Sequence, residues 1–153
     1  MPLDAPVVSN EVKEAVWKAY HDRKPIRVPV TVATNPRVFL LNPGLNKKNL
    51  TFQQVFEDPT VMLEAALEHE FYRRSVIHKY CDSPVGLPEE WTASVSWQNT
   101  YEAVFFGAAW DFREGQVPDV KPFLNEGNKH KVFDVDIDHP LDRGIFARTG
   151  IDF

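Results

Sequence analysis

Residues 86–107, with the sequence GLPEEWTASVSWQNTYEAVFFG, decide the predicted fold. Glycine and proline open the stretch, and residues 91–97 are rich in β-branched and aromatic side chains over the length of a strand. Polar residues then follow without a gap at 98–102. In α/β folds, ligands bind in the loops after the carboxyl ends of strands. The stretch therefore predicts either a strand with a candidate site at its end or an ordinary capped turn before a buried Val104.

Two further segments have the composition of strands. Residues 26–34 (IRVPVTVAT) have near-continuous β-branched content, although Pro29 favours an edge or end position. The turn residues Asn35, Pro36 and Arg37 follow directly, so a loop there can present the Arg37 side chain. Residues 108–113 alternate like a second strand and lead into a turn at 114–119.

Local signals mark the helices. A plausible N-cap stands at residues 9–10, and Thr51 with Gln54 forms a capping-box pattern. Asp58 before a proline is a usual way to start a helix at a new angle. The helices that we expect span residues 11–22, 52–56 and 59–80, and residues 141–153 have the pattern of a further helix start.

Composition limits the class of protein. Of the 153 residues, 43% are hydrophobic and 25% are charged, which is typical of one soluble globular domain. The formal net charge of -5 and the absence of a basic run disfavour nucleic acid and anionic membrane surfaces as partners. The single cysteine, Cys81, and an amino terminus without a signal-peptide pattern favour the cytoplasm. No apolar run approaches the ~20 residues of a membrane helix.

Strands that alternate with helices imply a parallel α/β fold. Several short motifs also follow one another along the chain: RVPV at 27–30, NPR at 35–37, TF at 51–52, DP at 58–59, GLP at 86–88, EA at 102–103, Gly107, GQVPD at 115–119 and DRGIFARTGIDF at 142–153. In this order they resemble the amino-terminal part of the uroporphyrinogen decarboxylase family. The resemblance implies a (β/α)8 TIM barrel, a fold that needs about 250 residues. Residues 1–153 would then form an amino-terminal, partial barrel, with a leading loop and helix at 1–24.

The resemblance implies two chemistries. The decarboxylases remove carboxylates from a tetrapyrrole without a cofactor, whereas related corrinoid methyltransferases use zinc ligands from the other half of the barrel. In the decarboxylases, two arginines after the first strand hold substrate carboxylates and an aspartate after the second contacts the pyrrole NH groups. Thr34 and Arg37 stand near the two arginine positions, and Gln98 or Asn99 stands near the aspartate. A neutral amide accepts a hydrogen bond but cannot stabilise a developing positive charge as a carboxylate does.

The candidate site combines these positions with their neighbours. If residues 27–34 and 92–97 are adjacent parallel strands, their ends lie ~4.8 Å apart and the following loops open onto one rim. Alternatively, Arg37 pairs with Glu102 and closes that rim. We predict Arg37, Gln98 and Asn99 as catalytic residues and Asn35, Trp97, Tyr101 and Glu102 as ligand-binding residues, with Trp97 and Tyr101 as an aromatic wall.

Other sequence features suggest no cofactor for this chain itself. Two histidines and three aspartates in KHKVFDVDIDHP (129–140) have a metal-like pattern, but an acidic, solvated loop fits them better than a metal site. Zinc and corrinoid enter only with the methyltransferase alternative. A third alternative is a half-barrel that only binds a ligand or a complementary chain. The expected partners are a small-molecule or tetrapyrrole ligand and further copies of the chain, through unpaired barrel edges.

Overall fold

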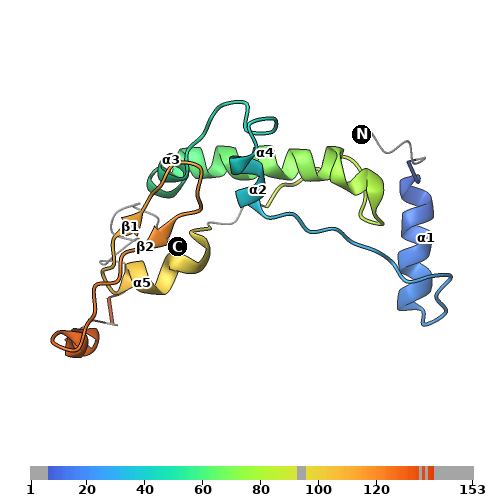
Figure 1. Ribbon diagram of the computed structural model, residues 1–153. Helices are drawn as coiled ribbons and strands as arrows, with labels where there is room; N and C mark the ends of the chain where they lie inside the picture. Colours follow the sequence, from blue (N-terminus) through green and yellow to red (C-terminus); the bar gives the residue numbers. More distant parts are fainter. Residues whose placement is uncertain (1–6, 93–95, 135, 137, 140–153) are drawn as a thin grey trace. The chain divides into compact units, whose positions relative to one another are not determined.

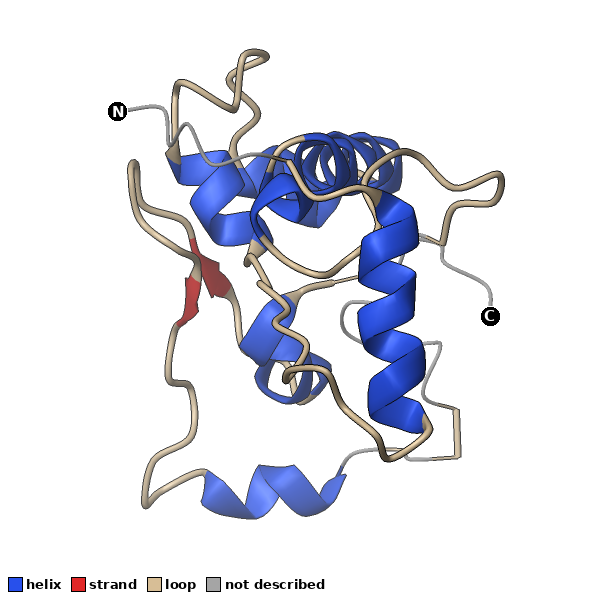
Figure 2. Cartoon of the chain, turned by 90° about the vertical axis from the view of Figure 1, so that its right-hand side faces the viewer, coloured by secondary structure: helices blue, strands red, loops and turns tan. Residues whose placement is uncertain are grey.

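The computed structural model describes residues 7–92, 96–134, 136, 138 and 139 (Figure 1). Helices make up most of the regular structure in this part of the chain, as Figure 2 shows. The expected helix at 141–153 lies outside the described residues. The elements are α1 (Asn10–His21), α2 (Pro36–Leu41), α3 (Phe52–Glu57), α4 (Pro59–Ser75), α5 (Tyr101–Phe105), β1 (Trp110–Asp111), β2 (Asp119–Val120) and the 3-10 helices η1 (Ile77–Tyr80), η2 (Gln98–Thr100) and η3 (Lys129–Asp134).

The chain divides into two compact units. The first comprises Met1–Pro36 and Ala66–Ala93, and the second comprises Arg37–Ala65 and Ser94–Phe153. Helix α4 contributes to both units, since the division falls within it.

Local signals position α3 and α4 as predicted. The Thr51 hydroxyl accepts a hydrogen bond from the Gln54 amide at 3.2 Å, and the Gln54 side chain accepts one from the Thr51 amide at 2.9 Å. This capping box starts α3. The Asp58 carboxylate accepts from the Thr60 amide at 2.8 Å and starts α4, which ends at Ser75 before η1 rather than continuing to residue 80 as one helix.

The first unit is held together by α1, whose expected position at 11–22 is confirmed. The side chain of Asn10 and the backbone of Val85 exchange two hydrogen bonds, at 2.9 and 2.8 Å. The Trp17 indole NH donates to the Asp82 carbonyl at 2.9 Å. These side-chain contacts bind the helix to the chain that follows η1.

The prediction of a strand at residues 26–34 is wrong, because these residues form an extended segment without strand pairing. Its backbone meets Asp82 instead: the Val30 amide donates to the Asp82 carboxylate at 2.8 Å, and the Val30 carbonyl accepts from the Asp82 amide at 2.7 Å. Pro29 has no amide NH to offer a neighbouring strand. High β-propensity gives a strand only where a partner and a buried face exist. The exposed apolar side chains of the segment are Ile26, Val28, Val30 and Val32.

An aromatic core organises the second unit. Trp97 is fully buried, and its indole NH donates to the Phe56 carbonyl at 3.0 Å. The Phe56 ring meets Trp110 edge to face, with centroids 5.6 Å apart. Trp110 also donates to the Thr100 hydroxyl at 3.1 Å, so this core fixes the position of η2.

The strand expected at 108–113 is present as the two-residue β1, which pairs antiparallel with β2. In the described part of the chain these are the only strands, and parallel pairing of 26–34 with 91–97 is not observed there. Residues 93–95 lie outside the described part. The partial barrel that the resemblance implies stays a prediction.

Candidate functional site

The structure brings together Arg37 and Asn99, two of the three residues predicted as catalytic. Arg37 follows Pro36 at the start of α2, and Asn99 lies in η2. The Arg37 Nη2 atom donates to the Asn99 Oδ1 atom at 2.8 Å. Both residues belong to the second unit. The expected meeting of the segments after residues 34 and 97 is observed at this hydrogen bond, although the described residues before Arg37 form no strand.

Gln98, the third predicted catalytic residue, has an unusual backbone. Its φ angle of 58° lies in the left-handed region, which is uncommon for a residue other than glycine. Its amide oxygen is buried and has no hydrogen-bond partner among the described residues. A buried acceptor without a donor costs about 1 to 3 kcal/mol.

Of the two rings predicted to form an aromatic wall, only that of Tyr101 remains a candidate. Trp97 is fully buried, so it belongs to the core and supports η2 instead of lining a site. Tyr101, at the start of α5, is half-buried and packs edge to face on Trp97, with ring centroids 5.5 Å apart. The sequence pattern could not separate the two rings, because both aromatic types occur in cores and at sites.

The remaining predicted residues are exposed. Glu102 lies in the first turn of α5, and among the described residues it forms no ion pair with Arg37. The guanidinium is hydrogen-bonded to Asn99 instead of being paired with Glu102. Asn35 precedes Arg37 by two residues and belongs to the first unit, so its place in a site with Arg37 stays a prediction.

A buried histidine that is not among the predicted site residues lies in the first unit. The Thr34 hydroxyl lies 3.0 Å from His69 Nε2, and the His69 side chain is 9% exposed. Burial lowers the pKa of His69, the Arg73 guanidinium lowers it further, and Glu70 partly offsets both effects. Its position three residues after the apolar Ala66, on the same side of the helix, was the signal for burial.

The single thiol is also buried. Burial alone would raise the pKa of the Cys81 thiol, but hydrogen bonds from Ser83 and Val32, together with the Lys13 charge, lower it.

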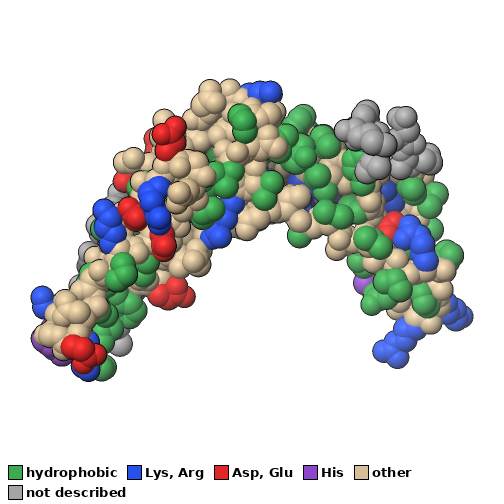
Figure 3. Space-filling view, in the orientation of Figure 1, with side chains coloured by type: hydrophobic (Ala, Val, Ile, Leu, Met, Phe, Trp, Pro, Cys, Tyr) green, Lys and Arg blue, Asp and Glu red, His purple; other side chains and the backbone are tan. Residues whose placement is uncertain are grey.

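Neither a metal site nor a membrane span is found in the described residues. No group of three or more His, Cys, Asp or Glu side chains there has the arrangement of a metal site. His139 Nδ1 lies 2.9 Å from an Asp136 carboxylate oxygen within the expected acidic loop. No helix described by the structure is long and apolar enough to cross a membrane. On the face shown in Figure 3, charged side chains of both signs stand among exposed hydrophobic ones.

In comparisons with known proteins, no family model, curated protein or solved structure matches the chain.

Proposed function

We propose that this chain is part of a cytoplasmic protein of the uroporphyrinogen decarboxylase family and that Arg37 and Asn99 bind a carboxylate-bearing small molecule. The reaction class that the resemblance implies is decarboxylation of a tetrapyrrole or a related compound, without a cofactor held by this chain. The observation that carries the proposal is the hydrogen bond between Arg37 and Asn99, which joins two segments 62 residues apart in sequence. The family resemblance also implies that these two segments contribute to one site.

The chemistry of Arg37 suits a carboxylate. A guanidinium is planar, keeps its charge at any physiological pH and presents parallel NH groups to two carboxylate oxygens. The bond from Nη2 to Asn99 Oδ1 fixes the orientation of this plane. A guanidinium that is oriented before binding loses less entropy when it holds a ligand. The hydrogen bond to Asn99 therefore favours both the affinity for a carboxylate and the orientation in which it binds.

Gln98 adds a hydrogen-bond acceptor, which a pyrrole ligand needs for its ring NH. Its buried amide oxygen is an acceptor without a donor among the described residues, and a pyrrole NH is a donor. Arg37 for a carboxylate and Gln98 for a ring NH together match a carboxylated pyrrole. These residues therefore bind and orient the ligand. The amides supply no negative charge for the reaction itself.

Titration with a matched pair of porphyrins tests the proposal. We expect the chain to bind a polycarboxylated porphyrin, measured by quenching of tryptophan fluorescence, at least tenfold more tightly than the same porphyrin with its carboxylates esterified. The apolar ring is common to both ligands, so the difference reports the carboxylates alone. Equal binding of acid and ester would show that the ring is held by exposed apolar surface and would contradict the proposal.

A further inference from the structure

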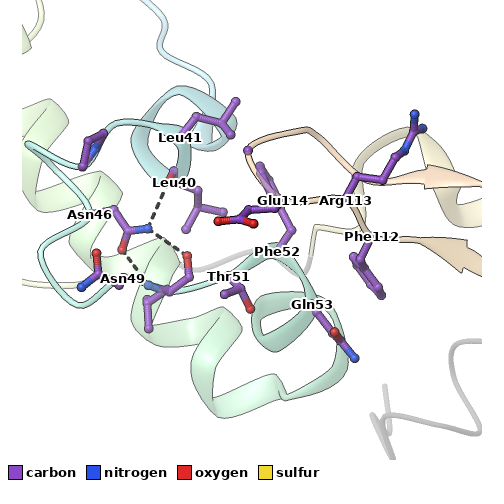
Figure 4. A pocket seen from close by; sticks show the side chains of 13 residues that line it. Leu40, Leu41, Asn46, Asn49, Thr51, Phe52, Gln53, Phe112, Arg113 and Glu114 are labelled. Carbon is purple, nitrogen blue, oxygen red and sulfur yellow. Dashed lines mark hydrogen bonds between the residues drawn. The ribbon is translucent and has the colours of Figure 1, made fainter.

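The second unit contains a pocket that the proposed function does not use. It has a volume of about 460 Å³ and lies between the α2–α3 connection and the turn that joins β1 to β2 (Figure 4). Small-molecule sites typically measure ~300 to 1,000 Å³. Helix α2 contributes its carboxyl end to this pocket, whereas Arg37 at its other end is not part of the lining. The apolar lining consists of Leu40, Leu41, Pro43, Leu50, Phe52 and Phe112.

One wall of the pocket is organised around the buried amide of Asn46. Its Nδ2 atom donates to the carbonyls of Leu40 and Leu50, at 3.0 and 2.8 Å, and its Oδ1 atom accepts from the Leu50 amide at 2.9 Å. Figure 4 shows these bonds holding the connection against the end of α2. The capping box at Thr51 continues the fixed backbone into α3. The wall is therefore formed before any ligand arrives, which favours binding.

The opposite side carries a carboxylate. The Gln116 amide donates to the Arg113 carbonyl at 3.2 Å, and Gly115 has a φ angle of 67°, as a type II turn requires at its third position. Figure 4 shows the Glu114 side chain extending from this turn towards Leu40. Among the described residues, Glu114 forms no hydrogen bond or ion pair.

The adjacent arginine is not the counter-ion of Glu114. Arg113 Nε lies 3.1 Å from an Asp111 carboxylate oxygen, and its Nη2 lies 3.7 Å from Asp119. Asp111 also lies 3.9 Å from Lys121 Nζ, so these two aspartates and two cations pair among themselves. Arg113 itself belongs to the pocket lining, together with polar residues such as Asn49 and Gln53. The exposed Glu114 carboxylate is the lining charge for which no described residue forms an ion pair.

We propose that this pocket binds a small organic amine, whose apolar body lies on the leucine and phenylalanine side chains and whose protonated amino group pairs with Glu114. Apolar burial supplies most of the affinity, at about 25 cal/mol per Å². The ion pair supplies selectivity for a cation over a neutral or anionic ligand of the same shape. The inference does not depend on Arg37 or on the family resemblance.

Three probes with one indole ring test the amine preference by isothermal titration calorimetry on the whole chain. Tryptamine, tryptophol and indole-3-propionate end in an ammonium, a hydroxyl and a carboxylate. We expect tryptamine to bind about fivefold more tightly than tryptophol, as a partly exposed ion pair provides, and indole-3-propionate to bind most weakly at this site. Failure of tryptamine to bind, or equal affinity for tryptamine and tryptophol, overturns the proposal.

Variants locate the interaction. Glu114→Gln should abolish the preference for tryptamine over tryptophol, whereas Glu126→Gln, which removes an exposed carboxylate outside the pocket lining, should preserve it. Leu41→Trp changes a side chain that is 41% exposed and should fill the pocket, weakening both probes at least fivefold with the circular dichroism spectrum unchanged. Arg37→Lys should leave tryptamine binding unchanged, which separates this site from the proposed carboxylate site. A preference that survives Glu114→Gln, or probe binding that survives Leu41→Trp, contradicts the assignment.

Discussion

Arg27 holds Asp82 with both terminal nitrogens of its guanidinium. Nη1 lies 2.6 Å from Oδ2 and Nη2 lies 2.5 Å from Oδ1, across 55 residues of sequence. The Asp82 side chain is 5% exposed, and it also accepts from the Val30 amide. This bidentate pair, and not strand pairing, fixes the extended segment at residues 26–34 in the first unit.

The pair predicts an acid-sensitive first unit. The hydrogen bonds from Arg27 lower the pKa of Asp82 from 3.8 to about 2 against the opposing effect of burial, and the Val30 amide contributes to the lowering. A carboxylate whose pKa is lower in the folded state stabilises that state above its unfolded pKa and loses this contribution as pH falls through the folded value. Glu70, paired with Arg73 and Arg74, behaves in the same way, with its pKa lowered from 4.5 to about 2.

We therefore expect the melting temperature to fall as the pH is lowered from about 4.5 to 2. Asp82→Asn should destabilise the chain at pH 7 by about 2 kcal/mol, because hydrogen bonds to a charged group are lost, and should flatten the acid dependence. Asp119→Asn, at a 65% exposed side chain, is the control. Calorimetric melts that show the same pH dependence for both variants would contradict this role of Asp82.

A buried lysine provides a second test. Lys13 is 1% exposed, and its Nζ atom donates to the carbonyls of His78 and Ser83 at 2.6 and 3.0 Å. Lys13→Met keeps the length of the side chain but leaves two carbonyls without their donor. We expect a loss of about 2 to 3 kcal/mol in urea unfolding.

The control for Lys13→Met is Lys18→Met on the same helix. Lys18 is 77% exposed and pairs with Asp22, and such pairs contribute less than about 1 kcal/mol. If the two variants lose equal stability, the buried ammonium does not organise the residues after η1.

Exposed apolar residues predict self-association. Ile26 and Val28 are 75% and 70% exposed in an extended segment, and such segments template pairing with other chains. We expect sedimentation velocity to show oligomers whose fraction rises with concentration. Val28→Lys should raise the monomer fraction, whereas Leu124→Lys, at a residue that is 37% exposed, should change it less. A single monomeric species at every concentration would contradict this prediction.

Short-range signals were sufficient to predict α1, α3 and the start of α4. The capping box at Thr51 and the cap at Asp58 form between residues two or three apart, so the sequence contains both partners side by side. The segment at 26–34 was mispredicted because its backbone partner, Asp82, lies 52 residues from Val30. Local propensity says nothing of a partner at that distance.

In the candidate site too, contacts between residues far apart in sequence could not be predicted from local patterns. Trp97 and Tyr101 have similar sequence contexts, but the Phe56 carbonyl, 41 residues from Trp97, makes one of them a core residue. The contact between Arg37 and Asn99 spans 62 residues. The sequence suggested it through the assumption of adjacent parallel strands and through the positions of the family motifs, since neither composition nor periodicity relates residues so far apart.

The central claim is that the Arg37 guanidinium, oriented by Asn99, binds a ligand carboxylate, and Arg37→Lys tests it most directly. Lysine keeps the charge but loses the planar pair of NH donors. With Arg23→Lys as the matched control at an exposed arginine, we predict that Arg37→Lys weakens binding of the polycarboxylated porphyrin about tenfold. The melting temperature should stay within about 2 °C, since the charge is kept. Unchanged affinity with a lower melting temperature would contradict the claim and make Arg37 a structural residue.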